Sequence, residues 1–146
     1  MTEDVEAVIE VAAPREQVWR AVTDPDLVAE WMGCFGFRAA PGAVFYMQPD
    51  RAKRAEGDTQ GAIICRLRTL DAPRRISFDW VFPDDPQTFV EIRLRRIAGG
   101  THVKLTHSGW DQFEPQETKD VREGLTRGWY AVALPALRRV AERLSA

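Results

Sequence analysis

The spacing of the apolar residues changes once along this chain, and that change limits the folds open to it. From about residue 34 to residue 109, apolar and polar residues alternate, as in the segment 90–94 with the sequence Val-Glu-Ile-Arg-Leu. A period of two is typical of strands in a sheet that has one buried and one wet face. Because the turns between these strands are short, as at Gly99-Gly100, the pattern predicts an antiparallel meander.

From residue 121 onward, the spacing becomes three and four, the period of a helix with one apolar stripe. The stripe consists of Val121, Leu125, Trp129, Val132, Ala133, Ala136, Leu137, Val140 and Leu144. Pro135 lies inside it, and because proline has no N–H to donate, a kink is predicted there. One long C-terminal helix is therefore expected to follow the strands.

The N-terminal part of the chain predicts one strand and two short helices. Residues 5–11 alternate, Pro14 opens a helix, and Asp24 ends it. Asp24 also caps the next helix, which Pro25 begins. Residues 48–60 are polar, with Gly57 near their end, and this segment is predicted to be a loop that gates a buried pocket. The predicted fold class is α+β.

Composition excludes several classes of function. The 146 residues fit one domain, 1–146, and the net charge of −2 lacks the broad positive field of a nucleic-acid binder. The acidic first residues do not resemble a signal peptide, and the uncharged stretch 128–137 is about half a membrane span. Cys34 and Cys65 are expected to be reduced in a cytoplasmic protein. Neither a metal nor a cofactor is expected from the motifs present.

Several short motifs follow one another in an order known from one superfamily. They are Ala13-Pro14-x-x-x-Val18-Trp19, Thr23-Asp24-Pro25 followed by Trp31, Pro73-Arg74-Arg75-Ile76-x-Phe78-x-Trp80, Gly100-Thr101-x-Val103-x-Leu105-Thr106-His107-Ser108-Gly109, and Gly128-Trp129. With them the chain resembles the START-like (SRPBCC, helix-grip) superfamily, and within it the activator of heat shock protein 90 ATPase homologue-like family. The resemblance implies a curved antiparallel sheet wrapped around the long C-terminal helix, with two short helices after the first strand. It also implies an apolar cavity between sheet and helix, which in other branches holds lipids or other hydrophobic molecules.

The large aromatic residues are the candidate walls of such a cavity, because aromatic walls with few polar groups are typical of ligand sites. Strand parity places His107 on the same apolar face, where its imidazole is the candidate polar contact. The full set of candidate ligand-binding residues is Trp31, Phe45, Phe78, Trp80, His107, Trp129 and Tyr130. The predicted ligand is a small hydrophobic or aromatic molecule.

Three other interpretations remain open on the sequence alone. The aromatic residues also fit a filled core, with His107 as a structural residue at a strand end. A co-chaperone-like or regulatory protein-binding module would show an exposed apolar patch and a filled cavity. A cyclase- or hydrolase-like enzyme would use His107 as acid or base and need a second titratable group beside it. Neither the identity of the ligand nor the oligomeric state follows from the sequence.

Overall fold

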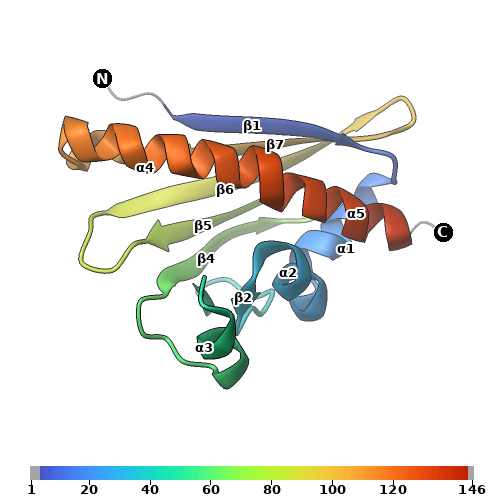
Figure 1. Cartoon of the computed structure of the whole chain (residues 1–146). Helices are drawn as coiled ribbons and strands as arrows, with labels where there is room; N and C mark the ends of the chain where they lie inside the picture. Colours follow the sequence, from blue (N-terminus) through green and yellow to red (C-terminus); the bar gives the residue numbers. More distant parts are fainter. Residues whose placement is uncertain (1–3, 145–146) are drawn as a thin grey trace.

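Seven antiparallel strands form one curved sheet, and a helical segment near the C-terminus lies across it (Figure 1). The structure is a computed structural model that describes residues 4–144, apart from the side chains at positions 115 and 117. The strands are β1 (Val5–Val11), β2 (Cys34–Phe35), β3 (Val44–Met47), β4 (Ile63–Asp71), β5 (Arg75–Val81), β6 (Gln87–Ile97) and β7 (Gly100–Ser108). Their order in the sheet is β1-β7-β6-β5-β4-β3-β2. The first strand of the chain, β1, therefore pairs with the last, β7.

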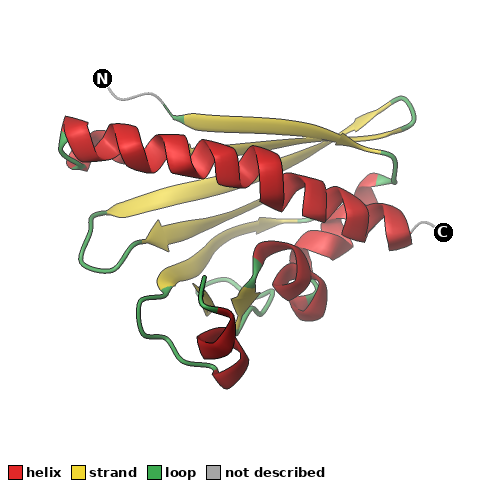
Figure 2. Cartoon of the chain, in the orientation of Figure 1, coloured by secondary structure: helices red, strands yellow, loops and turns green. Residues whose placement is uncertain are grey.

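The helices cover one face and one end of this sheet (Figure 2). They are α1 (Arg15–Thr23), α2 (Pro25–Met32), α3 (Arg51–Glu56), the 3-10 turn η1 (Trp110–Gln112), α4 (Pro115–Gly128), the π-helical turn η2 (Trp129–Ala133) and α5 (Leu134–Leu144). α5 packs against β1, α1 and α2. No helix within residues 4–144 has both the length and the apolar character needed to cross a membrane.

Side-chain burial confirms the alternation read from the sequence. The predicted inward positions Ile76, Phe78, Trp80, Val90, Ile92, Leu94, Val103, Leu105 and His107 are all buried, and Phe82 is partly buried. The arginines at the intervening positions of β4 and β6 are exposed. The fold class is therefore confirmed as the α+β helix-grip arrangement, with the core between the sheet and the C-terminal helix.

The two short helices after β1 form as predicted. The Asp24 side chain accepts hydrogen bonds from the backbone N–H groups of Asp26 (3.0 Å) and Leu27 (3.3 Å). This satisfies two of the N–H groups that a helix start leaves without partners, and Pro25 needs none. The tight α1–α2 corner holds Trp31 at the end of α2, where its indole N–H donates to the Ala21 carbonyl at 2.9 Å.

The prediction of a loop over residues 48–60 is wrong, because this segment contains α3. Asp50 caps α3 by accepting from the Lys53 N–H at 3.0 Å. The buried Gln48 amide donates to the carbonyls of Asp58 (2.9 Å) and Gln60 (3.0 Å), which ties both ends of the segment together. Because α3 buries none of its residues, it has no apolar stripe by which periodicity could detect it.

The C-terminal helix is not one continuous α-helix. The prediction placed an irregularity at Pro135, and the structure places it in the five residues just before, where η2 joins α4 to α5. Pro135 has no N–H to donate to the carbonyl four residues earlier. In η2 the Leu134 N–H instead donates to the Trp129 carbonyl, five residues back.

Gly100 is predicted to be one of the least replaceable residues of the sheet. A Cβ atom built there would lie 2.0 Å from the Val11 carbonyl oxygen and 3.2 Å from the Ala12 Cα, both backbone atoms. We expect Gly100→Ala to lower the free energy of unfolding by more than about 2 kcal/mol, because the β1–β7 pairing has to shift. Gly124→Ala is the control, since its Cβ would meet nothing within 4 Å and should stabilise α4 by about 1 kcal/mol. Urea denaturation of both variants measures the sign and size of each change in the free energy of unfolding. Equal small changes in the two variants would contradict the prediction.

Candidate functional site

Four aromatic side chains meet in the interior between the sheet and the C-terminal helix, at the β7 end remote from α1. Trp80 of β5 lies 5.3 Å from Trp129 of η2 and 5.5 Å from His107 of β7, measured between ring centroids. The His107 ring is 6.3 Å from Trp129 and 4.7 Å from Trp110 of η1. We call Trp80, His107, Trp110 and Trp129 the aromatic cluster.

The residue of the C-terminal helix that enters the aromatic cluster is the first residue of the π-helical turn. Trp129 begins the turn and is 3% exposed, whereas the next residue, Tyr130, is 46% exposed. A single π-helical turn shifts the faces of a helix, and such turns occur often at functional sites. Trp129 therefore points into the interior toward Trp80 and His107, while the next residue of the turn faces out.

The hydrogen bonds of His107 fix its tautomer. The Thr88 hydroxyl donates to the Trp80 carbonyl at 2.5 Å, so its oxygen accepts from the Nε2–H of His107 at 2.8 Å. The proton is therefore assigned to Nε2, and Nδ1 carries the free lone pair. The backbone carbonyl of His107 accepts from the Trp110 indole N–H at 2.9 Å, which anchors η1 to the strand end.

Burial keeps the His107 imidazole neutral. Its side chain is fully buried, and desolvation lowers the pKa of His107 from 6.5 to about 3. Because the only side-chain partner within hydrogen-bonding distance among the described residues is a threonine hydroxyl, no opposite charge offsets this shift. At neutral pH, the imidazole of His107 is therefore uncharged. Its Nε2–H is bonded to Thr88, and its Nδ1 atom can accept a hydrogen bond.

Three buried ring nitrogens of the aromatic cluster have no hydrogen-bond partner among residues 4–144. They are the indole Nε1 atoms of Trp80 and Trp129 and the Nδ1 atom of His107. A buried polar group without a partner costs about 1–3 kcal/mol. The cluster therefore presents two donors and one acceptor inside an otherwise apolar interior.

The other predicted site residues lie outside this cluster. Phe45 and Phe78 contact each other at 5.3 Å, and Phe37 joins them at 5.1 Å from Phe45, in a second group of rings under β3 and β5. Trp31 lies against α1, and Tyr130 makes no ring contact with the described residues. Ring contacts thus bring Trp80, His107 and Trp129 together, while Trp31, Phe45 and Phe78 lie elsewhere in the same core and Tyr130 is exposed.

Sequence reasoning did not assign a role to Thr88 or to the indole of Trp110. Thr88 is a polar residue at an inward position of β6, and that break in the apolar alternation was the available signal. Cys34 is buried, and desolvation raises the pKa of its thiol to about 12, so it is not a nucleophile at neutral pH. Within residues 4–144, no group of three or more His, Cys, Asp or Glu side chains lies close enough to hold a metal ion.

Comparison with known families agrees with this architecture. The family model described as "Activator of Hsp90 ATPase homolog 1-like protein" matches residues 12–140, which is most of the chain. The chain belongs to this family. Its match confirms the resemblance carried by the short motifs, and it runs from just after β1 into α5.

Several solved structures have the same fold, and two of them match this chain over nearly their whole length. The crystal structure of a Mesorhizobium loti protein has a TM-score of 0.74 and 25% identity, over 98% of this chain and 96% of that one. The solution structure of a Bacillus halodurans protein has a TM-score of 0.74 and 26% identity, over 97% and 98% of the two chains. DynU16, a protein of the dynemicin biosynthetic locus, has the same fold, with a TM-score of 0.73 and 24% identity over 97% of this chain and 48% of that one. No match was found among curated proteins.

Acid should destabilise the protein through His107. The pKa of His107 is lower in the folded state than its unfolded value of 6.5. As the pH falls below 6.5, the unfolded state therefore binds a proton before the folded state does. The free energy of unfolding should decrease between pH 6.5 and about 3. From pH 6.5 to 5, this loss should be about 2 kcal/mol. Urea denaturation of the wild type and of His107→Leu at both pH values measures it. The variant should lose much less over that interval, and an equal loss in both proteins would contradict the assignment.

Proposed function

We propose that this chain binds a small hydrophobic or aromatic molecule between the sheet and the C-terminal helix, with the aromatic cluster at one end of the site. Trp80 and Trp129 supply the contact surface, and His107 supplies a polar contact. Phe45 and Phe78 extend the apolar wall along the sheet toward β3. Trp31 and Tyr130 are assigned no direct contact, because the Trp31 indole N–H is already bonded to a carbonyl and Tyr130 is exposed.

The observation that carries this proposal is the set of three buried ring nitrogens without partners. Elsewhere in the described core, buried side chains do find partners. Trp31 donates to the Ala21 carbonyl, and the Thr101 hydroxyl donates to the Ala13 carbonyl at 2.8 Å. An interior that satisfies its polar groups elsewhere but not here is typical of a site where a second molecule supplies the hydrogen bonds.

The chemistry of the three nitrogens narrows the ligand. Two indole N–H groups donate, and the unprotonated Nδ1 of His107 accepts. An oxygen that both accepts and donates, as in a phenol or an alcohol, matches this combination, whereas a purely apolar molecule leaves all three unmatched. The rings around it favour an aromatic or otherwise flat apolar body, through stacked and edge-to-face contacts.

The interpretations as an enzyme and as a protein-binding module have less support. Acid–base catalysis by His107 would need a second titratable group within reach, and its side-chain hydrogen-bond partner is Thr88. A protein-binding module would be expected to show one apolar patch. The exposed large apolar side chains among the described residues come instead from β1, β4, β6 and η2, at Val8, Ile64, Phe89, Tyr130 and Val132.

Native mass spectrometry of freshly purified protein tests the proposed function. We expect the wild type to carry a small molecule that is released on denaturation. Trp129→Phe keeps a large ring and removes the indole N–H, so the Kd for the bound molecule should rise about tenfold through the loss of one hydrogen bond, and the occupied fraction should fall. Trp19→Phe, a matched change in α1 outside the aromatic cluster, should leave occupancy unchanged.

Nuclear magnetic resonance of the indole N–H groups provides the second measurement, with 2-naphthol as the added probe. Its hydroxyl should shift the signals of Trp80 and Trp129 and leave that of Trp31, which is already bonded to a carbonyl. An empty protein in the mass spectrum, together with unshifted Trp80 and Trp129 signals, would contradict the proposed function.

A further inference from the structure

The outer face of the sheet, opposite the C-terminal helix, contains a strongly basic groove. It has a volume of about 680 Å³ and is lined by Arg15, Asp71, Arg74, Arg75, Arg93, Leu94, Arg95, His102 and Lys104. We call this the basic groove. Six of its side chains are cationic and one is acidic, although the whole chain has a net charge of −2. The positive charge of the protein is therefore concentrated locally, on a face that the internal site does not use.

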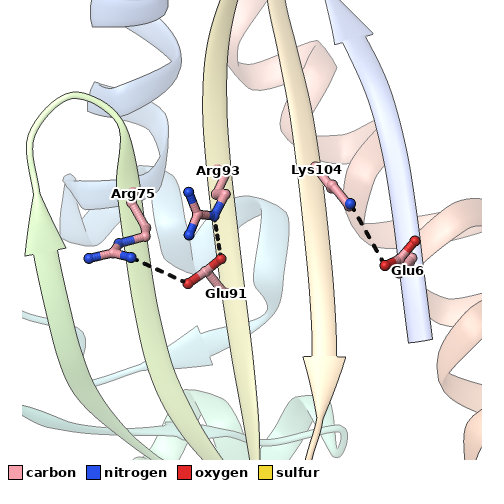
Figure 3. A network of polar contacts seen from close by, with 5 residues as sticks. All are labelled: Glu6, Arg75, Glu91, Arg93 and Lys104. Carbon is pink, nitrogen blue, oxygen red and sulfur yellow. Dashed lines mark hydrogen bonds and ion pairs between the residues drawn. The ribbon is translucent and has the colours of Figure 1, made fainter. Parts of the chain in front are cut away.

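Sheet register places cations directly opposite one another in the basic groove. Arg75 of β5 pairs with Arg93 of β6, and Arg93 pairs with Lys104 of β7. Figure 3 shows these three side chains in a row across three strands, on one side of the sheet. Like charges in directly opposite positions destabilise a sheet. A row that breaks this rule is the kind of local conflict that proteins keep at functional sites.

The neighbouring carboxylates neutralise only part of this charge. Glu91 contacts Arg93 at 2.5 Å and Arg75 at 3.9 Å, and Glu6 contacts Lys104 at 3.7 Å (Figure 3). Asp71 contacts Arg74 at 3.6 Å. Six cations against the three carboxylates that contact them leave about three positive charges without a carboxylate in contact, while Glu10 borders the groove opposite His102.

Two arginines of the basic groove are available to a ligand. Arg15 and Arg95 make no ion pair or side-chain hydrogen bond with any described residue. In addition, the Nε atoms of Arg15 and Arg75 are buried and have no acceptor among residues 4–144. Guanidinium N–H groups that are already withdrawn from water gain most from an anionic acceptor.

We propose that the basic groove binds a small molecule carrying two or more phosphate groups. The volume of 680 Å³ is that of a small-molecule site. Five of the six cations are arginines, whose planar guanidinium groups match phosphate oxygens in pairs. The unmatched charge of about three fits a di- or triphosphate better than a single carboxylate. This site is independent of the internal ligand, because it lies on the opposite face of the same strands.

Calorimetric titration with inorganic tripolyphosphate, at low ionic strength, tests the basic groove. We expect saturable binding to the wild type and a Kd at least tenfold weaker for Arg95→Gln, since one charge-assisted contact is lost. Arg139→Gln removes the same charge from an exposed position on α5 and should change Kd less than twofold. Arg15→Gln repeats the test at the other unpaired arginine, should Arg95→Gln reduce the thermal stability of the protein.

Several outcomes would overturn the assignment. Absence of binding at millimolar tripolyphosphate would overturn it. An equal increase in Kd for Arg95→Gln and Arg139→Gln would also overturn it, because the effect would then be one of net charge. A hexaglutamate peptide that binds as tightly as tripolyphosphate would overturn the preference for phosphate. The effect of Arg95→Gln on the Kd for tripolyphosphate is also measured in a protein that carries Trp129→Phe. A tenfold weakening there too would support the independence of the two sites, and its loss would overturn that independence.

Discussion

The one-sided burial of the sheet is the constraint on which the rest of this structure depends. In β6, Ile92 lies under the C-terminal helix while its neighbours Glu91 and Arg93 face water. The same alternation in β5 and β7 creates an apolar inner face and a polar outer face from alternate residues of the same strands. A shift of one residue in any of these strands would exchange the two faces, so packing under the helix also fixes the positions of the outer cations.

Much of this arrangement was predictable because alternation is a local property of the sequence. The inward residues of β5, β6 and β7 and the Asp24-Pro25 helix start were read directly from it. The hydrogen bond from His107 to Thr88 was not predictable, since it joins residues 19 positions apart through cross-strand register. Val90 is the residue paired with His107, and Thr88 is two positions away on the same face. Periodicity predicts which face of the sheet a side chain lies on, but not which residue of the neighbouring strand lies beside it.

The two elements that sequence reasoning missed have different physical causes. α3 is held by a cap at Asp50 and by the buried Gln48 amide rather than by an apolar face, so it leaves no periodic signal. The π-helical turn was missed because the apolar spacing of the sequence continues through it. That spacing predicts Val132 to be buried, whereas the structure exposes it. Trp129 lies on the stripe at regular helical spacing from Val121 and Leu125, and it contacts Trp80 as that spacing predicts. The departure from the regular period begins after Trp129 and changes which of the following residues are exposed.

The distribution of unpaired polar atoms links the two proposed sites. Six buried side-chain nitrogens lack a partner among the described residues, and five of them belong to two places. Trp80, His107 and Trp129 supply three inside the sheet, and Arg15 and Arg75 supply two in the basic groove. Buried donors and acceptors in folded proteins are almost always matched, because each unmatched one costs free energy that core packing has to offset. Their concentration on opposite faces of the same strands supports the two proposed sites, the internal one for a molecule with a hydroxyl on an apolar body and the outer one for a molecule with several phosphate groups.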